Sequence, residues 1–201
     1  MTLHSLHRSL GLIFILPFIG WILTGLVFLF KPGYQQAYER ITPTAYPISQ
    51  TLKINPQPHW QSFRVIKTIL GTHLLVKTNT EALQLSPTTQ EPIPAPSQTD
   101  IERLLTDAIK LNPARYGDII SFEDQRFMTS TGVELTLDWP TLNITQKGRD
   151  TRIISTLYKI HYLQWLGHKS ANKILGALGL LGLLFLVYFG CLIYCKNLLK
   201  S

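Results

Sequence analysis

Cysteine is scarce in this chain of 201 residues, which has only Cys191 and Cys195, both near the C-terminus. A scaffold held together by disulfides is therefore excluded for the long region that precedes them. The two cysteines are one helical turn apart, with no histidine or acidic residue near them in the sequence. We interpret them as small apolar side chains near a membrane face, because metal or redox chemistry would need such partners.

Motifs of known catalytic sites are also missing. The chain has no nucleophile elbow, no zinc-protease helix and no glycine loop of the kind that cradles phosphate. Glu123, Asp124 and Asp138 form no recognisable acid–base pair, and His59 and His73 lack metal-ligand spacing. We predict no catalytic residue and no metal site, interpret the two histidines as surface or strand polar residues, and expect a protein that is not an enzyme.

Acidic residues are absent from both ends of the chain. All twelve fall between Glu39 and Asp150, whereas the ends carry Arg8, Lys196 and Lys200. The formal net charge is +7, but no basic helix or stripe of the kind that neutralises phosphates is present. We therefore predict no nucleic-acid binding, and basic residues that flank membrane spans explain the charge.

Charge is absent from two long apolar runs, Leu10–Phe30 and Ile174–Cys195. At about 1.5 Å of rise per residue, each run can cross a hydrocarbon core of about 30 Å as a helix. The first run exceeds a signal-peptide core of about 7–15 residues, and no small-x-small cleavage site precedes Lys31. We predict a retained anchor, a second span, and both chain ends on one side of the lipid bilayer. The positive-inside rule orients such a long loop poorly.

The polar region between the runs divides into a proline-rich spacer (31–58), a folded domain (59–150) and an amphipathic lead-in to the second span (151–173). Tails of residues 1–9 and 196–201 flank the spans. Alternation and β-branched residues predict strands at 63–70, 73–78, 82–86, 118–122, 126–130, 134–138 and 142–146. Apolar spacing predicts a helix over 100–111, with Thr99 and Glu102 as a capping box. The fold class is therefore α+β, an antiparallel sheet covered on one face by a helix.

Glycine recurs every third residue in the second span, at Gly176, Gly179 and Gly182. Small residues let another helix backbone approach closely in lipid, where hydrophobic attraction between helices is absent. Two alternatives follow. The stripe pairs the two spans of one chain, with Gly20, Thr24 and Gly25 on the first, or it forms a homodimer face or a docking face for another membrane protein.

Two segments carry a family resemblance. His7–Leu12 (HRSLGL) at the start of the first span and Leu157–Gly167 (LYKIHYLQWLG) before the second resemble PepSY-associated transmembrane proteins. The predicted domain is similar to the small PepSY domain that these proteins display. Ser9 stands where the family often has an aromatic residue, and longer relatives have additional spans. The resemblance implies a bacterial inner (plasma) membrane protein with a periplasmic loop domain and both termini cytoplasmic.

The resemblance does not imply one activity, because members are linked to peptidase regulation or to ferric-siderophore and haem-dependent reduction. Our leading hypothesis is a non-catalytic binding or regulatory protein whose partner is another membrane or periplasmic protein. A structural accessory without a ligand is also open. The alternative is an accessory subunit of a haem-dependent membrane reductase in iron-siderophore uptake.

Haem held by two imidazoles needs histidines at equal depth on neighbouring helices. His4 and His7 open the first span, whereas His161 and His168 precede the second. A His7–His161 pair in one chain would have to reach across the membrane, so haem would be shared between chains. We expect no cofactor for the chain alone and assign no cofactor-binding residue.

Overall fold

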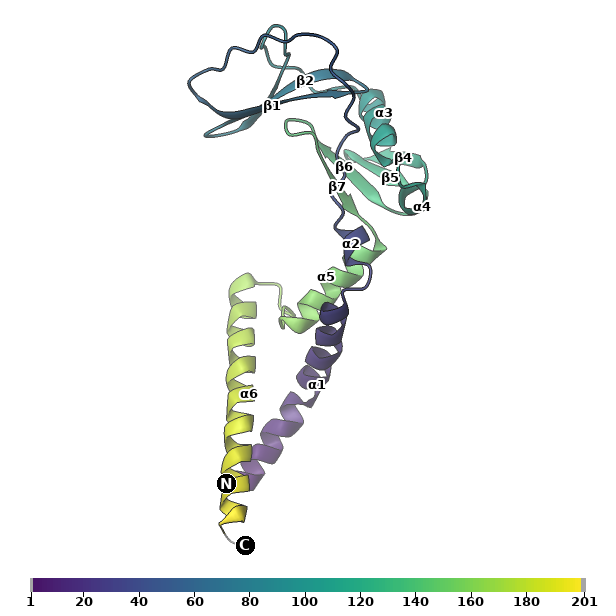
Figure 1. Cartoon of the computed structure of the whole chain (residues 1–201). Coiled ribbons are helices and arrows are strands. Elements are labelled where there is room, and N and C mark those ends of the chain that lie inside the picture. The colour runs from purple at the N-terminus through teal and green to yellow at the C-terminus, as the bar shows by residue number, and fades with distance from the viewer. Residues whose placement is uncertain (1, 200–201) are drawn as a thin grey trace. The chain divides into compact units, whose positions relative to one another are not determined.

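The computed structural model describes residues 2–199 and divides the chain into two compact units. The membrane unit contains the residues up to Tyr34 and those from Arg152 onward. The domain unit contains Gln35–Thr151. Figure 1 labels their elements.

The membrane unit contains α1 (Leu3–Phe30), most of α5 (Arg149–His161) and α6 (Lys169–Leu198). The two predicted spans lie in α1 and α6. Helices α1 and α6 are long and apolar enough to cross a membrane. The helix α1 begins before the apolar run because Thr2 caps it, accepting a hydrogen bond from the Ser5 backbone N–H at 3.3 Å. It ends at Phe30, and the next residue, Lys31, adopts a left-handed conformation with φ of 47°.

The domain unit contains seven strands and three short helices among the described residues. The strands are β1 (Trp60–Thr68), β2 (Gly71–Thr78), β3 (Ala82–Leu85), β4 (Ile119–Glu123), β5 (Arg126–Thr129), β6 (Glu134–Asp138) and β7 (Asn143–Lys147). The helices are α2 (Tyr34–Ala37, which begins at the boundary between the units), α3 (Gln98–Ile109) and α4 (Pro113–Tyr116). The predicted α+β class is confirmed.

The strands form two antiparallel sheets, β1-β2-β3 and β4-β5-β6-β7, rather than the single sheet expected from the sequence. The helix α3 follows the first sheet in the chain and packs against both. Its Leu104 contacts the cluster that contains Leu75 of β2, while the adjacent Leu105 belongs to the cluster around Phe127 and Leu135 of the second sheet. Both leucines are fully buried. Two neighbouring side chains therefore join the two halves of the core.

The predicted spacer over 31–58 is wrong in its first half. Ala37 and Ile41 are buried in the core, and Ile41 forms a β-bridge with Ile144 of β7. The backbone N–H of Tyr46 donates to the carbonyl of Lys67 at 2.8 Å, which covers part of the outer edge of β1. Proline density argued against a helix or an interior strand, but it allows an extended segment to lie along a sheet edge.

The predicted capping box is also wrong. The helix α3 begins after Ser97, whose hydroxyl accepts from the backbone N–H of Asp100 at 3.2 Å and donates to the Asp100 carboxylate at 2.7 Å. Ser97 and Asp100 have the same spacing as Thr99 and Glu102, and an aspartate in the first turn also suits the helix dipole. The prediction placed the cap two residues too late, at Thr99 instead of Ser97.

The predicted lead-in over 151–173 is interrupted. Helix α5 ends at His161, and the chain reverses through Leu163, which has a φ of 52°. The side chain of Asn172 then accepts from the Leu166 backbone N–H and donates to the Leu166 carbonyl, both at 2.8 Å. These two bonds close the turn that leads into α6.

Candidate functional site

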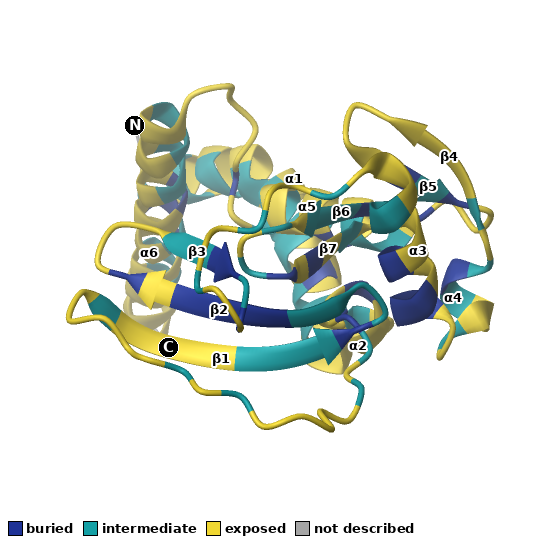
Figure 2. Ribbon diagram, turned by 90° about the horizontal axis from the view of Figure 1, so that it is seen from above, coloured by how far each residue is buried: buried dark blue, intermediate teal, exposed yellow. Residues whose placement is uncertain are grey.

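The domain unit has a groove of about 520 Å³ on one face of the first sheet. Its walls come from β1, β2, the turn between β2 and β3, and the turn that follows β6. Its lining includes Ser62, Arg64, Leu75, Lys77, Glu81, Ala82, Pro140 and Thr141. Figure 2 shows that β2 is mostly buried while the N-terminal half of β1 is exposed.

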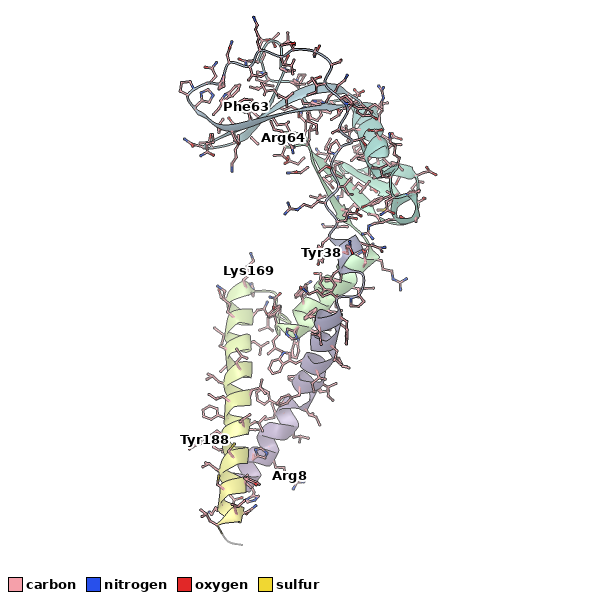
Figure 3. The ribbon with its side chains drawn as sticks, in the orientation of Figure 1. Arg8, Tyr38, Phe63, Arg64, Lys169 and Tyr188 are labelled. Carbon is pink, nitrogen blue, oxygen red and sulfur yellow. The ribbon has the colours of Figure 1, made fainter. Side chains whose placement is uncertain are left out.

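Strand register gathers two cations on this face. Arg64 lies opposite Leu75, and Ser62 lies opposite Lys77. Residues that face each other across an antiparallel pair share one side of the sheet, as do residues two apart along a strand. Arg64 and Lys77 are therefore diagonal neighbours, and Figure 3 shows Arg64 and Phe63 on opposite sides of β1.

The two cations have no acidic partner among residues 2–199. The side chains of Arg64 and Lys77 make no ion pair or hydrogen bond there, and Glu81 is the acidic residue in the lining. Leu75 gives the groove a buried apolar floor. The combination suits a ligand that has an anionic group beside an apolar portion.

The turn beside the groove is fixed by one hydroxyl. Thr78 Oγ1 accepts from the backbone N–H groups of Thr80 and Glu81 at 3.3 and 3.1 Å, and donates to the Glu81 carbonyl at 3.0 Å. The side chain of Gln61 donates to Asn79 at 2.6 Å. These bonds hold the end of the groove in one conformation.

His73 lies in the core rather than at a surface. Its Nε2 is 2.8 Å from Thr68 Oγ1, its Nδ1 is 2.5 Å from Gln84 Nε2, and its ring lies edge-on to Trp139 at 5.5 Å between centroids. Burial lowers the pKa of His73 below its usual value. A neutral imidazole satisfies both neighbours, so this histidine has a structural role.

His59 remains exposed next to Trp60. Over the described part of the chain, no three histidine, cysteine, aspartate or glutamate side chains form a group that could hold a metal ion. The free thiols Cys191 and Cys195 are both exposed on α6.

In the membrane unit, His161 packs against the first span rather than lying beyond its end. Its Nδ1 is 2.8 Å from Thr24 Oγ1, and its carbonyl accepts from Trp21 Nε1 at 2.6 Å. The ring of Phe28 lies edge-on to the imidazole at 5.0 Å. The end of α5 therefore lies against α1 at a depth that belongs to the predicted span (Figure 1).

His7 lies far from His161. Its Cε1 atom lies 3.4 Å from the position that a Cβ on Gly190 of α6 would take, near the opposite end of α1 from Thr24. His7 and Thr24 are seventeen positions apart along one helix, which is about 25 Å. The two histidines therefore cannot hold one haem as an axial pair within a single chain.

The glycines of α6 mediate contacts within the chain. A Cβ on Gly182 would lie 2.0 Å from the ring of Phe14, and a Cβ on Gly179 would lie 2.7 Å from Leu163. At Gly176 the nearest atom would be 3.9 Å away, at the carbonyl of Tyr162. Gly179 and Gly182 thus pack against side chains of the same chain.

A chain with two long apolar helices around an α+β domain of two antiparallel sheets is a membrane protein that carries one folded loop domain. The family model of the PepSY-associated TM region matches residues 2–197, and the chain belongs to this family. No curated protein and no solved structure matches the chain.

Proposed function

We propose that this protein is a non-catalytic binding or regulatory module anchored in the bacterial inner membrane. Its domain (Gln35–Thr151) faces the periplasm, and both termini lie in the cytoplasm. The groove beside Arg64 and Lys77 captures a segment of another membrane or periplasmic protein, and the two spans keep the domain at the membrane surface. The observation that carries the proposal is the pair of unpartnered cations over an apolar floor.

Charge complementarity supports an acidic segment as the partner's contact. Arg64 and Lys77 lie on neighbouring strands within the groove. A carboxylate between them would form charge-assisted hydrogen bonds without displacing an existing partner. The apolar floor at Leu75 would accept the adjoining side chain of the ligand.

Site-specific photocrosslinking in intact cells tests the proposal. A photoreactive amino acid replaces Ser62 in the groove or, as a matched control, the exposed Ile120 on β4 of the other sheet. We expect an adduct with another envelope protein from position 62, and we expect it to be lost when Arg64 and Lys77 are both changed to glutamate. Adducts from position 120 alone would contradict the groove as the binding surface.

Cysteine labelling tests the orientation in a background where Cys191 and Cys195 are replaced by alanine. A membrane-impermeant maleimide should label Ser62→Cys in intact cells and should label Ser5→Cys only after lysis. Labelling in the opposite order would refute a periplasmic domain. A Soret band in the purified protein that His161→Ala removes would instead favour the reductase alternative, with haem shared between copies.

A further inference from the structure

The hydrogen bonds of Thr24 determine which nitrogen of His161 carries the proton. Thr24 Oγ1 lies 2.6 Å from the carbonyl oxygen of Gly20 and 3.4 Å from that of Trp21. Both oxygens can only accept, so the single hydroxyl hydrogen points toward them. The hydroxyl must then accept from His161, whose Nδ1 lies 2.8 Å away. In the neutral imidazole this leaves Nε2 as an acceptor with a lone pair.

No group in the described chain donates to Nε2 of His161, and His161 is one of the residues that line a cavity of about 280 Å³ in the membrane unit. The other residues of its lining are Trp21, Tyr162, Leu163, Gly176, Leu180 and Leu183. They come from α1, from the segment after α5 and from α6. Trp21 and Leu180 belong to the candidate membrane spans, so the cavity borders the part of the chain that is expected to lie in lipid.

The cavity offers few other polar groups. The indole N–H of Trp21 already donates to the carbonyl of His161 at 2.6 Å. The ring of Tyr162 is more than half exposed and stacks on that of Tyr158, with centroids 6.0 Å apart and planes at 5°. The leucines supply only apolar surface. His161 is thus the residue that brings a free acceptor to mostly apolar walls.

We propose that this cavity binds a lipid-soluble molecule that carries a hydroxyl donor, such as a lipophilic phenol or alcohol. Its O–H group donates to Nε2 of His161, and its apolar body lies against Leu180 and Leu183. A hydrogen bond shielded from water discriminates strongly against a ligand that lacks the donor, because the acceptor is then left unpaired. This site is independent of the groove in the domain unit.

Two probes that differ only in the donor test the proposal. The full chain in phosphatidylcholine nanodiscs is titrated with 4-octylphenol or with its methyl ether, 4-octylanisole, and empty nanodiscs correct for partition into lipid. We expect the phenol to bind about tenfold more tightly than the ether. His161→Phe should abolish the preference, whereas His168→Phe, at an exposed histidine outside the cavity, should retain it.

Two further measurements keep the test decisive if His161→Phe fails to fold. Leu183→Trp fills the cavity without touching the imidazole bond and should weaken both probes. Nitrogen-15 NMR of the wild-type chain should show that the phenol shifts Nε2 of one histidine, and that the ether does not. Equal affinity for the two probes, or a phenol that leaves every histidine signal unchanged, would overturn the proposal and leave acyl chains as the occupant.

Discussion

The carboxylate of Asp150, in the first turn of α5, lies 2.8 Å from the guanidinium of Arg115 at the end of α4. Only 9% of the Arg115 side chain is exposed, and its Nε also donates to Gln146 at 2.9 Å. The pair joins three segments of the domain unit, because Gln146 belongs to β7. We therefore expect the loss of this ion pair to destabilise the domain.

Replacing Asp150 by asparagine should lower the free energy of unfolding by about 1–3 kcal/mol, since it leaves the buried guanidinium without its counter-ion. Urea midpoints, followed by tryptophan fluorescence in detergent micelles, measure the loss. Asp124→Asn is the matched control, because Asp124 is 79% exposed and lies 4.0 Å from Arg126. We expect no measurable change for that variant. Equal losses in both variants would contradict the assigned role.

The same pair predicts a dependence on acid. Burial raises the pKa of Asp150, but hydrogen bonds from Arg115 and the Thr151 backbone outweigh it and lower the pKa below 3.8. The folded state thus binds this proton less readily than the unfolded chain. The stabilisation is complete above pH of about 4 and is lost as the pH falls through the lowered pKa. In Asp150→Asn this part of the acid sensitivity should disappear.

The buried His73 leads us to expect a second pH dependence of stability, closer to neutral pH than that of Asp150. Burial lowers its pKa from 6.5, so the unfolded chain takes up a proton that the folded domain resists. Stability should be constant above pH of about 6.5 and should fall from there toward the lowered pKa. Urea midpoints between pH 8 and 5 measure the slope. His73→Gln should flatten it and His59→Gln should not. A slope unchanged by His73→Gln would refute the assignment.

The position of the α3 cap gives a sharper comparison. Ser97→Ala removes the side chain that accepts from the Asp100 N–H and should cost about 1 kcal/mol of stability. Thr99→Ala, two residues later and inside the helix, should cost much less. Thermal midpoints of the two variants measure the difference. The reverse order would restore Thr99 as the cap.

The sequence predicted most elements because their signals are local. Charge-free runs located α1 and α6, and the alternation of Glu134–Asp138 matched β6 at both ends. The groove beside Arg64 and Lys77 could not be predicted, because these residues share a face only through the register of β1 and β2, and Pro140 comes from a distant turn. Local patterns carry no information on such pairings.

The contact between His161 and Thr24 was missed for a related reason. His161 and Thr24 are 137 positions apart, and the sequence placed that histidine at the end of the loop. Threonine inside a charge-free span was the available signal, since a hydroxyl in lipid bonds its own helix backbone or a neighbouring side chain. The chain turns at Leu163, which has a positive φ although it is not glycine. The sequence therefore contained no signal that predicted this turn.

The contact between Gly182 and Phe14 predicts how the two spans tolerate bulk. A Cβ on Gly182 would lie within 2.9 Å of three ring atoms, so Gly182→Ala must displace the ring and should cost about 1–3 kcal/mol. Gly176→Ala is the matched control on the same helix, with 3.9 Å of clearance. Thermal midpoints in nanodiscs compare the two. Adding Phe14→Leu to Gly182→Ala should recover part of the loss, because the smaller side chain vacates the space that the new methyl group needs. A loss in Gly176→Ala as large as that in Gly182→Ala would show that the glycine stripe packs against another chain.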